Sequence, residues 1–205
     1  MSTHRQAISW QDWAGEPVSY TEAGWTLARK YRDEDTDAPA GLIDLSHRPK
    51  ALVYGPAVEK LGRLSPGRAE WNGQAFLCCR KPGECIVYDL LGPLQPQWPD
   101  RYYTDMTDAW VLLALIGPRA REVIQRLAAI DFERPDRPGP LFAVTRGHGL
   151  WLQLLNPRRK APGFFLATER SHGQNLAKGL RHVGHHLGLK IMGLDAFNDW
   201  FTRSD

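Results

Sequence analysis

The 205-residue sequence has little of several features that mark particular protein classes. Its only cysteines, Cys78, Cys79 and Cys85, cannot all pair and lack a zinc-ligand spacing, so we expect reduced, buried thiols in a cytoplasmic protein. The longest apolar run, residues 109–116, is far too short to span a membrane. Residues 1–13 contain no uninterrupted apolar stretch of the kind that a secretory signal needs. We therefore expect a soluble, cytoplasmic protein with no membrane partner.

Charge of one sign is also scarce, with 26 Lys and Arg against 23 Asp and Glu. A surplus of this size is too small to indicate a nucleic-acid partner. The basic clusters at residues 119–121 and 157–160 are typical of solvated loops or helices. The sequence contains no Gly-rich phosphate loop of the P-loop or dinucleotide-binding type. These features predict a globular domain that does not bind nucleic acid.

Tryptophan is abundant, with eight in the chain, and three of them lie within the first 25 residues. Residues 1–40 are otherwise irregular and include a charged stretch at 30–37, which predicts an extended N-terminal arm. Large aromatic side chains outside a regular element often anchor a segment on another surface. Trp10, Trp13 and Trp25 could therefore dock on a partner chain, or they could fold back onto this domain. The sequence leaves both alternatives open.

From residue 41 onward a four-part pattern occurs twice, at residues 44–64 and 105–128. Each copy has an Asp/Ser/Thr-rich turn, an apolar strand, a Gly-Pro corner and a helix. Glycine tolerates the backbone angles of a sharp strand exit, and proline loses nothing in the first turn of a helix. Each helix precedes a predicted hairpin, at residues 74–89 and 150–167, and a closing helix is predicted at 171–187.

This order predicts an α+β fold with two related strand–helix–strand–strand halves, antiparallel sheets and helices packed on one face. The predicted domain covers residues 41–205 after the arm at 1–40. Within it we expect a pseudo-repeat of residues 41–104 and 105–197.

Two segments resemble a known family. Residues 41–47, GLIDLSH, are similar to the opening "G-hydrophobic-x-D-[VL]-S-H" segment of the glycine-cleavage T-protein (aminomethyltransferase) superfamily. Residues 107–120, TDAW through GPRA, are similar to the "S-D-A-W…G-P-x-A" segment of the gamma subunit of heterotetrameric sarcosine oxidase and related N-methyl amino acid demethylating complexes. The resemblance covers about residues 41–197 and implies a T-protein-like fold.

The departures from the family pattern concern catalysis. T-proteins that transfer one-carbon units carry an Asp in a Gly-rich hairpin near the folate pteridine, but residues 71–78 have no carboxylate near the hairpin tip. The family's R-T-G-Y-T-G-E segment is matched only by residues 145–149, which lack the Glu. The sequence also ends at Asp205, where a full T-protein continues into a further barrel domain. The resemblance thus implies an auxiliary, non-catalytic subunit of an oxidase or demethylase complex. The alternative is a stand-alone tetrahydrofolate-dependent one-carbon transferase or demethylase.

The same resemblance implies flavoprotein subunits as partners in a hetero-oligomer. Tetrahydrofolate and flavin would belong to the assembled complex, with neither in the isolated chain and with no metal. Where a cofactor touches this chain, the resemblance points to His47, Arg48 and Asp108. Sarcosine, dimethylglycine and N-methylglutamate are all candidate substrates of the complex.

Two further constellations favour structural interpretations. His182 and His186 are four residues apart on the predicted closing helix, as two metal ligands could be, but no third ligand lies nearby in sequence. Asp44, Ser46 and His47 include the residue types of a catalytic triad, yet neighbours on an extended chain point apart. We therefore predict that Asp44 and Ser46 form a turn by bonding the local backbone.

Overall fold

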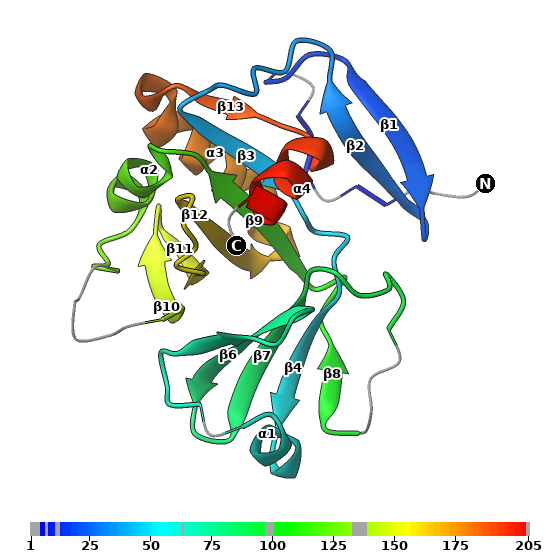
Figure 1. The fold of residues 1–205 in the computed structure, drawn as a ribbon, viewed down its shortest axis with the longest axis vertical. Coiled ribbons are helices and arrows are strands. Elements are labelled where there is room, and N and C mark those ends of the chain that lie inside the picture. The colour runs from blue at the N-terminus through cyan, green and yellow to red at the C-terminus, as the bar shows by residue number, and fades with distance from the viewer. Residues whose placement is uncertain are drawn as a thin grey trace.

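The computed structural model describes residues 5–6, 8–10, 13–62, 64–96, 101–132 and 139–203 (Figure 1). The strands in these ranges are β1 Pro17–Glu22, β2 Trp25–Tyr31, β3 Ala40–Asp44, β4 Lys50–Tyr54, β5 Ala69–Trp71, β6 Ala75–Lys81, β7 Glu84–Asp89, β8 Tyr103–Asp105, β9 Trp110–Ile116, β10 Leu141–Gly147, β11 Leu150–Asn156, β12 Gly163–Glu169 and β13 Leu189–Ile191. The helices are α1 Pro56–Lys60, α2 Ala120–Leu127, α3 Gly173–Gly184 and α4 Leu194–Arg203, with 3₁₀ turns η1 Arg170–His172 and η2 His185–Leu187 on either side of α3. None of the helices in these ranges is long and apolar enough to cross a membrane.

Two sheets form the body of the protein (Figure 1). One has the strand order β5-β6-β7-β4-β8, and the other has the order β10-β11-β12-β9-β3-β13. Neighbouring strands are antiparallel except β13 and β3, which are parallel. The first five positions of the two strand orders correspond to each other. At the fifth position, however, each sheet contains a strand from the other half of the chain. Strand β3 precedes β4 in the chain yet pairs with β9, while β8 precedes β9 yet pairs with β4.

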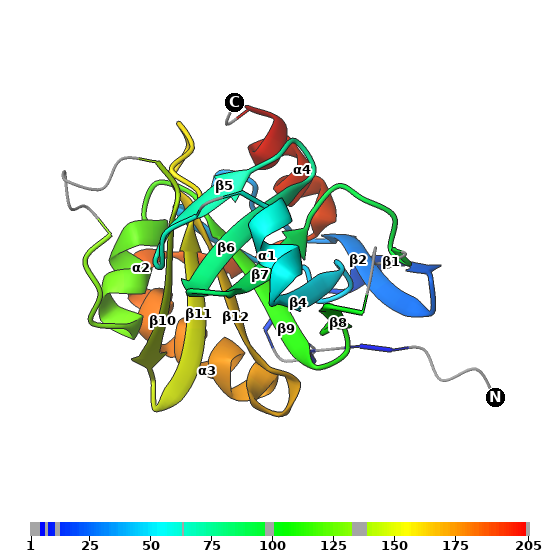
Figure 2. The same cartoon turned by 90° about the horizontal axis from the view of Figure 1, so that it is seen from below.

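The inner faces of the two sheets share one apolar cluster, to which Phe76 and Ile86 contribute from one sheet and Leu112 and Phe165 from the other. Helix α4 adds Phe197 to this cluster. Helices α2 and α3 lie on the opposite face of the six-stranded sheet, and α1 lies against the five-stranded sheet (Figure 2). The molecule is thus two sheets packed on each other, with α1, α2 and α3 on their outer faces and α4 packed against the cluster between them.

Both Gly-Pro corners occupy the predicted position between a strand and a helix. Gly55 and Gly117 have φ angles of 63° and 106°, a region that residues with a Cβ rarely adopt. A Cβ at Gly117 would also lie 2.8 Å from the carbonyl oxygen of Pro39. Pro56 stands in the first turn of α1, where its missing N–H has no partner to lose. The backbone geometry therefore requires glycine at both corners.

The N-terminal segment folds back onto the domain. Strands β1 and β2 form an antiparallel hairpin. Trp25 and Leu27 enter the cluster between the sheets, and Trp10 is buried in the cluster beneath α3, with Trp13 packed against it. Of the two alternatives for these tryptophans, the structure shows the second, and the segment is not an arm extended away from the core. The domain boundary at residue 41 stays a prediction.

The predicted α+β class, with antiparallel sheets and helices packed on a face, is confirmed. The sequence did not predict the β1–β2 hairpin, the strands β3, β5, β8, β10 and β13, or helix α4. The closing helix, predicted to residue 187, ends as an α-helix at Gly184 and continues as η2. The exchange of β3 and β8 between the sheets was also not foreseen, because strand pairing is nonlocal.

Candidate functional site

Two matching turns lie at the centre of the molecule, one before β4 and one before β9. In the first, Oδ1 of Asp44 accepts a hydrogen bond of 2.9 Å from the backbone N–H of Ser46. In the second, Oδ1 of Asp105 accepts one of 2.8 Å from the backbone N–H of Thr107. These are Asx turns, in which a short side chain replaces a backbone acceptor. The prediction that Asp44 forms a turn is confirmed.

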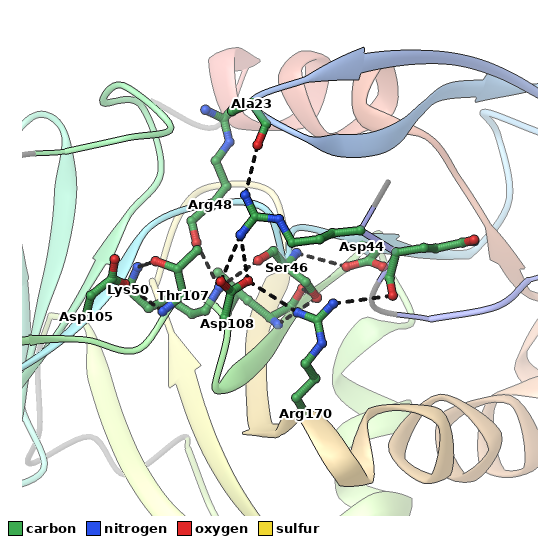
Figure 3. Close-up of polar contacts among 12 residues, drawn as sticks. Ala23, Asp44, Ser46, Arg48, Lys50, Asp105, Thr107, Asp108 and Arg170 are labelled. Atoms are coloured by element: carbon green, nitrogen blue, oxygen red, sulfur yellow. Dashed lines mark hydrogen bonds and ion pairs between the residues drawn. The ribbon is translucent and has the colours of Figure 1, made fainter. Parts of the chain in front are cut away.

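The hydroxyl group of each turn bonds the strand that follows the other turn (Figure 3). Oγ of Ser46 accepts from the backbone N–H of Leu112 on β9, at 3.1 Å. Oγ1 of Thr107 accepts from the backbone N–H of Lys50 on β4, also at 3.1 Å. The turns are therefore reciprocal clamps between the sheets. They explain why Asp, Ser and Thr recur at this position of the repeat.

Lys50 is the unexpected member of this centre, because its side chain is fully buried. Its Nζ donates hydrogen bonds of 2.8 Å to the carbonyl oxygens of Ser46 and Arg48, which fixes the intervening turn. Burial lowers the pKa of Lys50 to about 7, while the carboxylates of Asp44 and Asp105 partly oppose this. The ammonium group thus serves the backbone and has no carboxylate hydrogen-bonded to it within the described residues.

A cavity of about 380 Å³ lies between the first turn and the N-terminal hairpin. Its aromatic lining includes Trp10, Trp25 and Tyr31, and its acidic lining consists of Asp44 and Glu16. No Lys or Arg of the described chain lines it. The cavity is therefore aromatic and acidic.

His47 also lines this cavity and is 3% exposed. Its imidazole has no hydrogen-bond partner within the described ranges. Burial, with smaller contributions from Arg48 and Lys50, lowers the pKa of His47 to about 3. The ring is thus neutral at physiological pH and can accept one hydrogen bond and donate another.

The carboxyl and phenol groups beside His47 are also desolvated. Burial raises the pKa of Asp44, although the hydrogen bonds from Ser46 oppose this. Burial also raises the pKa of the Tyr31 hydroxyl, and the charges of Asp44 and Glu34 add to the effect. Tyr31 and Asp44 therefore lie close enough to interact electrostatically.

The other two predicted cofactor-binding residues do not join His47 in the cavity. The Nε atom of Arg48 is buried without a hydrogen-bond partner in the described part of the chain, and its charge acts on Tyr20 and Glu22 of β1. Asp108 is exposed and accepts hydrogen bonds of 2.8 and 2.9 Å from Arg5. The structure thus brings one of the three predicted residues into the cavity, and a cofactor role for any of them stays a prediction.

Lys50 and Tyr31 are the members of this centre that the sequence did not single out. A lysine at the start of the apolar run of residues 51–53 could have signalled Lys50, since a charge there must be either solvated or paired. No local signal marks Tyr31, because the cavity forms only when the β1–β2 hairpin folds back onto the domain.

The β5–β6 hairpin has a tip closed on itself. Oδ1 of Asn72 accepts hydrogen bonds from the backbone N–H groups of Gln74 and Ala75, at 3.0 and 2.8 Å. A carboxylate does lie close by, because Asp89 accepts from the side chain of Gln74, at 2.8 Å, and from the backbone N–H of Gly92, at 2.7 Å. Asp89 is 3% exposed. Its oxygens are used within the fold.

The remaining candidate residues occupy structural positions. The thiols of Cys78, Cys79 and Cys85 are buried, as predicted, and burial raises the pKa of each, so they are not reactive thiolates. His182 and His186 are exposed. Within the described residues no group of His, Cys, Asp or Glu is arranged to hold a metal ion.

No protein-family model matches the chain. Among curated proteins it is similar to the aminomethyltransferases of Desulforamulus reducens (23% identical, over 84% of this chain and 56% of that protein), Streptomyces coelicolor (26%, over 84% and 55%) and Mycobacterium tuberculosis H37Rv (25%, over 89% and 65%). The chain thus spans between 55% and 65% of the length of these relatives.

Two solved structures have a similar fold. The first is the heterotetrameric sarcosine oxidase from Corynebacterium sp. U-96 in complex with pyrrole 2-carboxylate, with a TM-score of 0.61 and 13% identity, covering 74% of this chain and 87% of that chain. The second is the glycine cleavage system aminomethyltransferase T from Bartonella henselae, with a TM-score of 0.60 and 19% identity, covering 90% and 58%. The predicted resemblance is confirmed: the chain is similar in sequence to aminomethyltransferases and has a T-protein-like fold.

Proposed function

We propose that this protein is an auxiliary, non-catalytic subunit of a flavin- and folate-linked complex that oxidises or demethylates an N-methyl amino acid. The observation that carries this proposal is the closed tip of the β5–β6 hairpin. Where a folate-dependent transferase needs a free carboxylate, the tip has Asn72, whose Oδ1 already accepts two backbone hydrogen bonds. The nearby carboxylate of Asp89 is buried and holds Gln74 and Gly92. Neither group is free to exchange a proton with a substrate.

The lining of the cavity beside His47 disfavours both cofactors. It contains Asp44 and Glu16 and no described Lys or Arg, so it offers no cation for the glutamate carboxylates of a folate or the phosphate of a flavin nucleotide. Under this proposal both cofactors bind elsewhere in the complex, and His47, Arg48 and Asp108 contact them at most at their edges.

A hetero-oligomeric setting is supported by the structurally similar sarcosine oxidase from Corynebacterium sp. U-96, which is a heterotetramer. The shared fold covers 87% of the matched chain of that assembly. We infer that this chain likewise assembles with flavoprotein subunits. Its tryptophans at positions 10 and 25 are unavailable as contacts, because they are buried in its own core.

A second candidate function is a tetrahydrofolate-dependent one-carbon transferase or demethylase that works without partners. The observation that favours it is the sequence similarity to aminomethyltransferases over 84–89% of the chain. The two candidates differ in what the isolated chain can do.

The discriminating experiment incubates the purified chain with sarcosine and tetrahydrofolate and measures formaldehyde and methylenetetrahydrofolate. We expect no product above the background without protein, because no described acid or base is free at the hairpin tip. A complete aminomethyltransferase, assayed with its own substrates, serves as the positive control for folate quality. Turnover by the pure chain would overturn the subunit proposal in favour of the transferase.

A further inference from the structure

We propose that the cavity between the first Asx turn and the N-terminal hairpin binds a small organic ammonium ion. This site lies beyond the proposed subunit function, which requires no ligand on this chain. The cavity combines about 380 Å³ of space with Asp44, His47 and Tyr31 on its walls (Figure 3 shows the turn that carries Asp44).

The polar groups of the cavity point to a ligand that donates hydrogen bonds. Asp44 accepts hydrogen bonds only from Ser46 among the described residues, and a carboxylate can accept more than these. His47 is almost fully buried and without a partner in the described ranges, and Tyr31 offers a hydroxyl. Buried polar groups are nearly always hydrogen-bonded, so an unpartnered imidazole beside this space indicates a missing partner. All three groups can accept an N–H.

The charges of the cavity select a cation. Asp44 and Glu16 are its acidic residues, and no described Lys or Arg lines it. Glu16 is paired with Arg32 at 2.6 Å outside the cavity lining, so Asp44 is the carboxyl group left for a ligand. Lys50 and Arg170 act on Asp44 only from outside the cavity, and neither donates a hydrogen bond to it. Among the described residues no Lys or Arg side chain is hydrogen-bonded to the Asp44 carboxyl group, whose hydrogen bonds come from Ser46. An ammonium ion would supply both the charge and the N–H donors.

The aromatic walls of the cavity further limit which ammonium ions can bind. Trp10 and Tyr31 present ring surface, against which the apolar substituents of an amine can pack, and ammonium groups are attracted to aromatic faces. The guanidinium groups of Arg5 and Arg170 each lie 5.0 Å from the ring centroid of Trp25. The indole of Trp25 therefore already has cation–π partners within the protein. The absence of a basic residue among the described lining residues disfavours a ligand carboxylate. We therefore expect simple amines to bind better than amino acids.

The test is isothermal titration of the full chain with benzylammonium, with benzyl alcohol as its uncharged counterpart and sarcosine as a zwitterion. We expect benzylammonium to bind at least about tenfold more tightly than either, since hydrogen bonds to charged groups are the stronger kind. Equal binding of benzyl alcohol would show an apolar cavity only and would overturn the proposal. Failure of benzylammonium to bind at millimolar concentration would do the same.

The chain offers a matched pair of variants for this test. Asp44→Asn keeps an oxygen for the turn but removes the charge, so we expect a loss of affinity of about tenfold or more. Asp105→Asn makes the same change in the second turn, which is exposed and outside the cavity, and should leave affinity unchanged. Equal affinities of Asp44→Asn and wild type would contradict the assignment. If Asp44→Asn does not fold, the comparison of charged and uncharged ligands on the wild type still decides. The assay uses no partner chain, so its outcome is independent of the subunit role.

Discussion

The two Asx turns make the same hydrogen bonds but have different surroundings. In each turn an Asp accepts a hydrogen bond from the backbone of its own turn, and a hydroxyl group accepts one from the strand that follows the other turn. The backbone N–H groups that these hydroxyls accept from belong to Lys50 and Leu112, whose side chains are each fully buried. Leu112 simply joins the apolar cluster, whereas Lys50 needs two carbonyl acceptors to be tolerated. The second turn faces solvent through Asp105 and Asp108.

The first turn differs because the N-terminal hairpin covers it and leaves a cavity there. The common backbone bonds are a structural requirement of exchanging strands between sheets. The buried charges of the first turn are not such a requirement, since the second turn does without them. That difference is what assigns the candidate site to the first turn.

Removing the N-terminal segment that covers the first turn should have the largest effect on stability. Deleting residues 1–28 removes Trp10, Trp25 and Leu27 from the core. Truncating a single buried Trp costs about 3–5 kcal/mol, and total stability is commonly about 5–15 kcal/mol, so we expect the truncated chain to lose cooperative unfolding. Circular dichroism during thermal unfolding measures this. A truncated chain with a native spectrum and a sharp transition would mean that the segment is dispensable, as an assembly arm would be.

Exchanging the buried side chains tests whether the two turns are interchangeable. Leu112→Lys buries an ammonium group without carbonyl acceptors and should cost about 3–5 kcal/mol. Lys50→Leu leaves the carbonyl groups of Ser46 and Arg48 without their donor and should cost about 1–3 kcal/mol. Urea unfolding of both variants measures the difference. A larger loss of stability in Lys50→Leu than in Leu112→Lys would contradict this expectation.

The same pair predicts a pH dependence. Because the pKa of Lys50 falls from 10.5 to about 7 on folding, the unfolded chain binds a proton between these values that the folded chain does not. Wild-type stability should therefore rise from pH 7 towards pH 10 through this group, and Lys50→Leu should lack that rise. The buried thiols act in the opposite direction above about pH 8.5, where unfolded cysteine ionises. The difference between wild type and Lys50→Leu in the free energy of unfolding, measured from pH 7 to about pH 8.5, therefore isolates the contribution of Lys50.

The smallest effects should come from the two hydroxyl clamps. Ser46→Ala and Thr107→Val each leave one buried backbone N–H without its acceptor, at a cost of about 1–3 kcal/mol. We expect the two costs to agree to within about 1 kcal/mol, because the bonds are reciprocal and equally long. Unequal losses on urea unfolding would show that one turn relies on its clamp and the other does not.

Much of the fold could be predicted because its signals are local. The apolar runs of β4 and β9 lead into Gly-Pro corners, and the stripe of Val123, Ile124 and Leu127 on α2 is buried as its spacing indicates. Strand β1 was missed because only Val18 and Tyr20 alternate with polar residues in it, and both are exposed, so no buried face distinguishes it. The pairing of β3 with β9 is set by tertiary packing and has no sequence signal.

The candidate site was predicted less well, for related reasons. The family motif led to His47, which does line the cavity, and to Arg48, which points elsewhere. Asp108 pairs with Arg5 across 103 residues of chain, which no local pattern indicates. Lys50 was overlooked because a lysine is ordinarily exposed, and only two carbonyl groups brought together by the turn make its burial possible.

The subunit role is tested most directly by isolating the tagged protein from its source organism under native conditions. We expect the protein to elute with flavin-containing chains, and this material to consume oxygen or an electron acceptor when an N-methyl amino acid is added. The recombinant chain alone should show neither flavin nor turnover. A native protein that elutes alone, without flavin, and forms methylenetetrahydrofolate by itself would contradict the account.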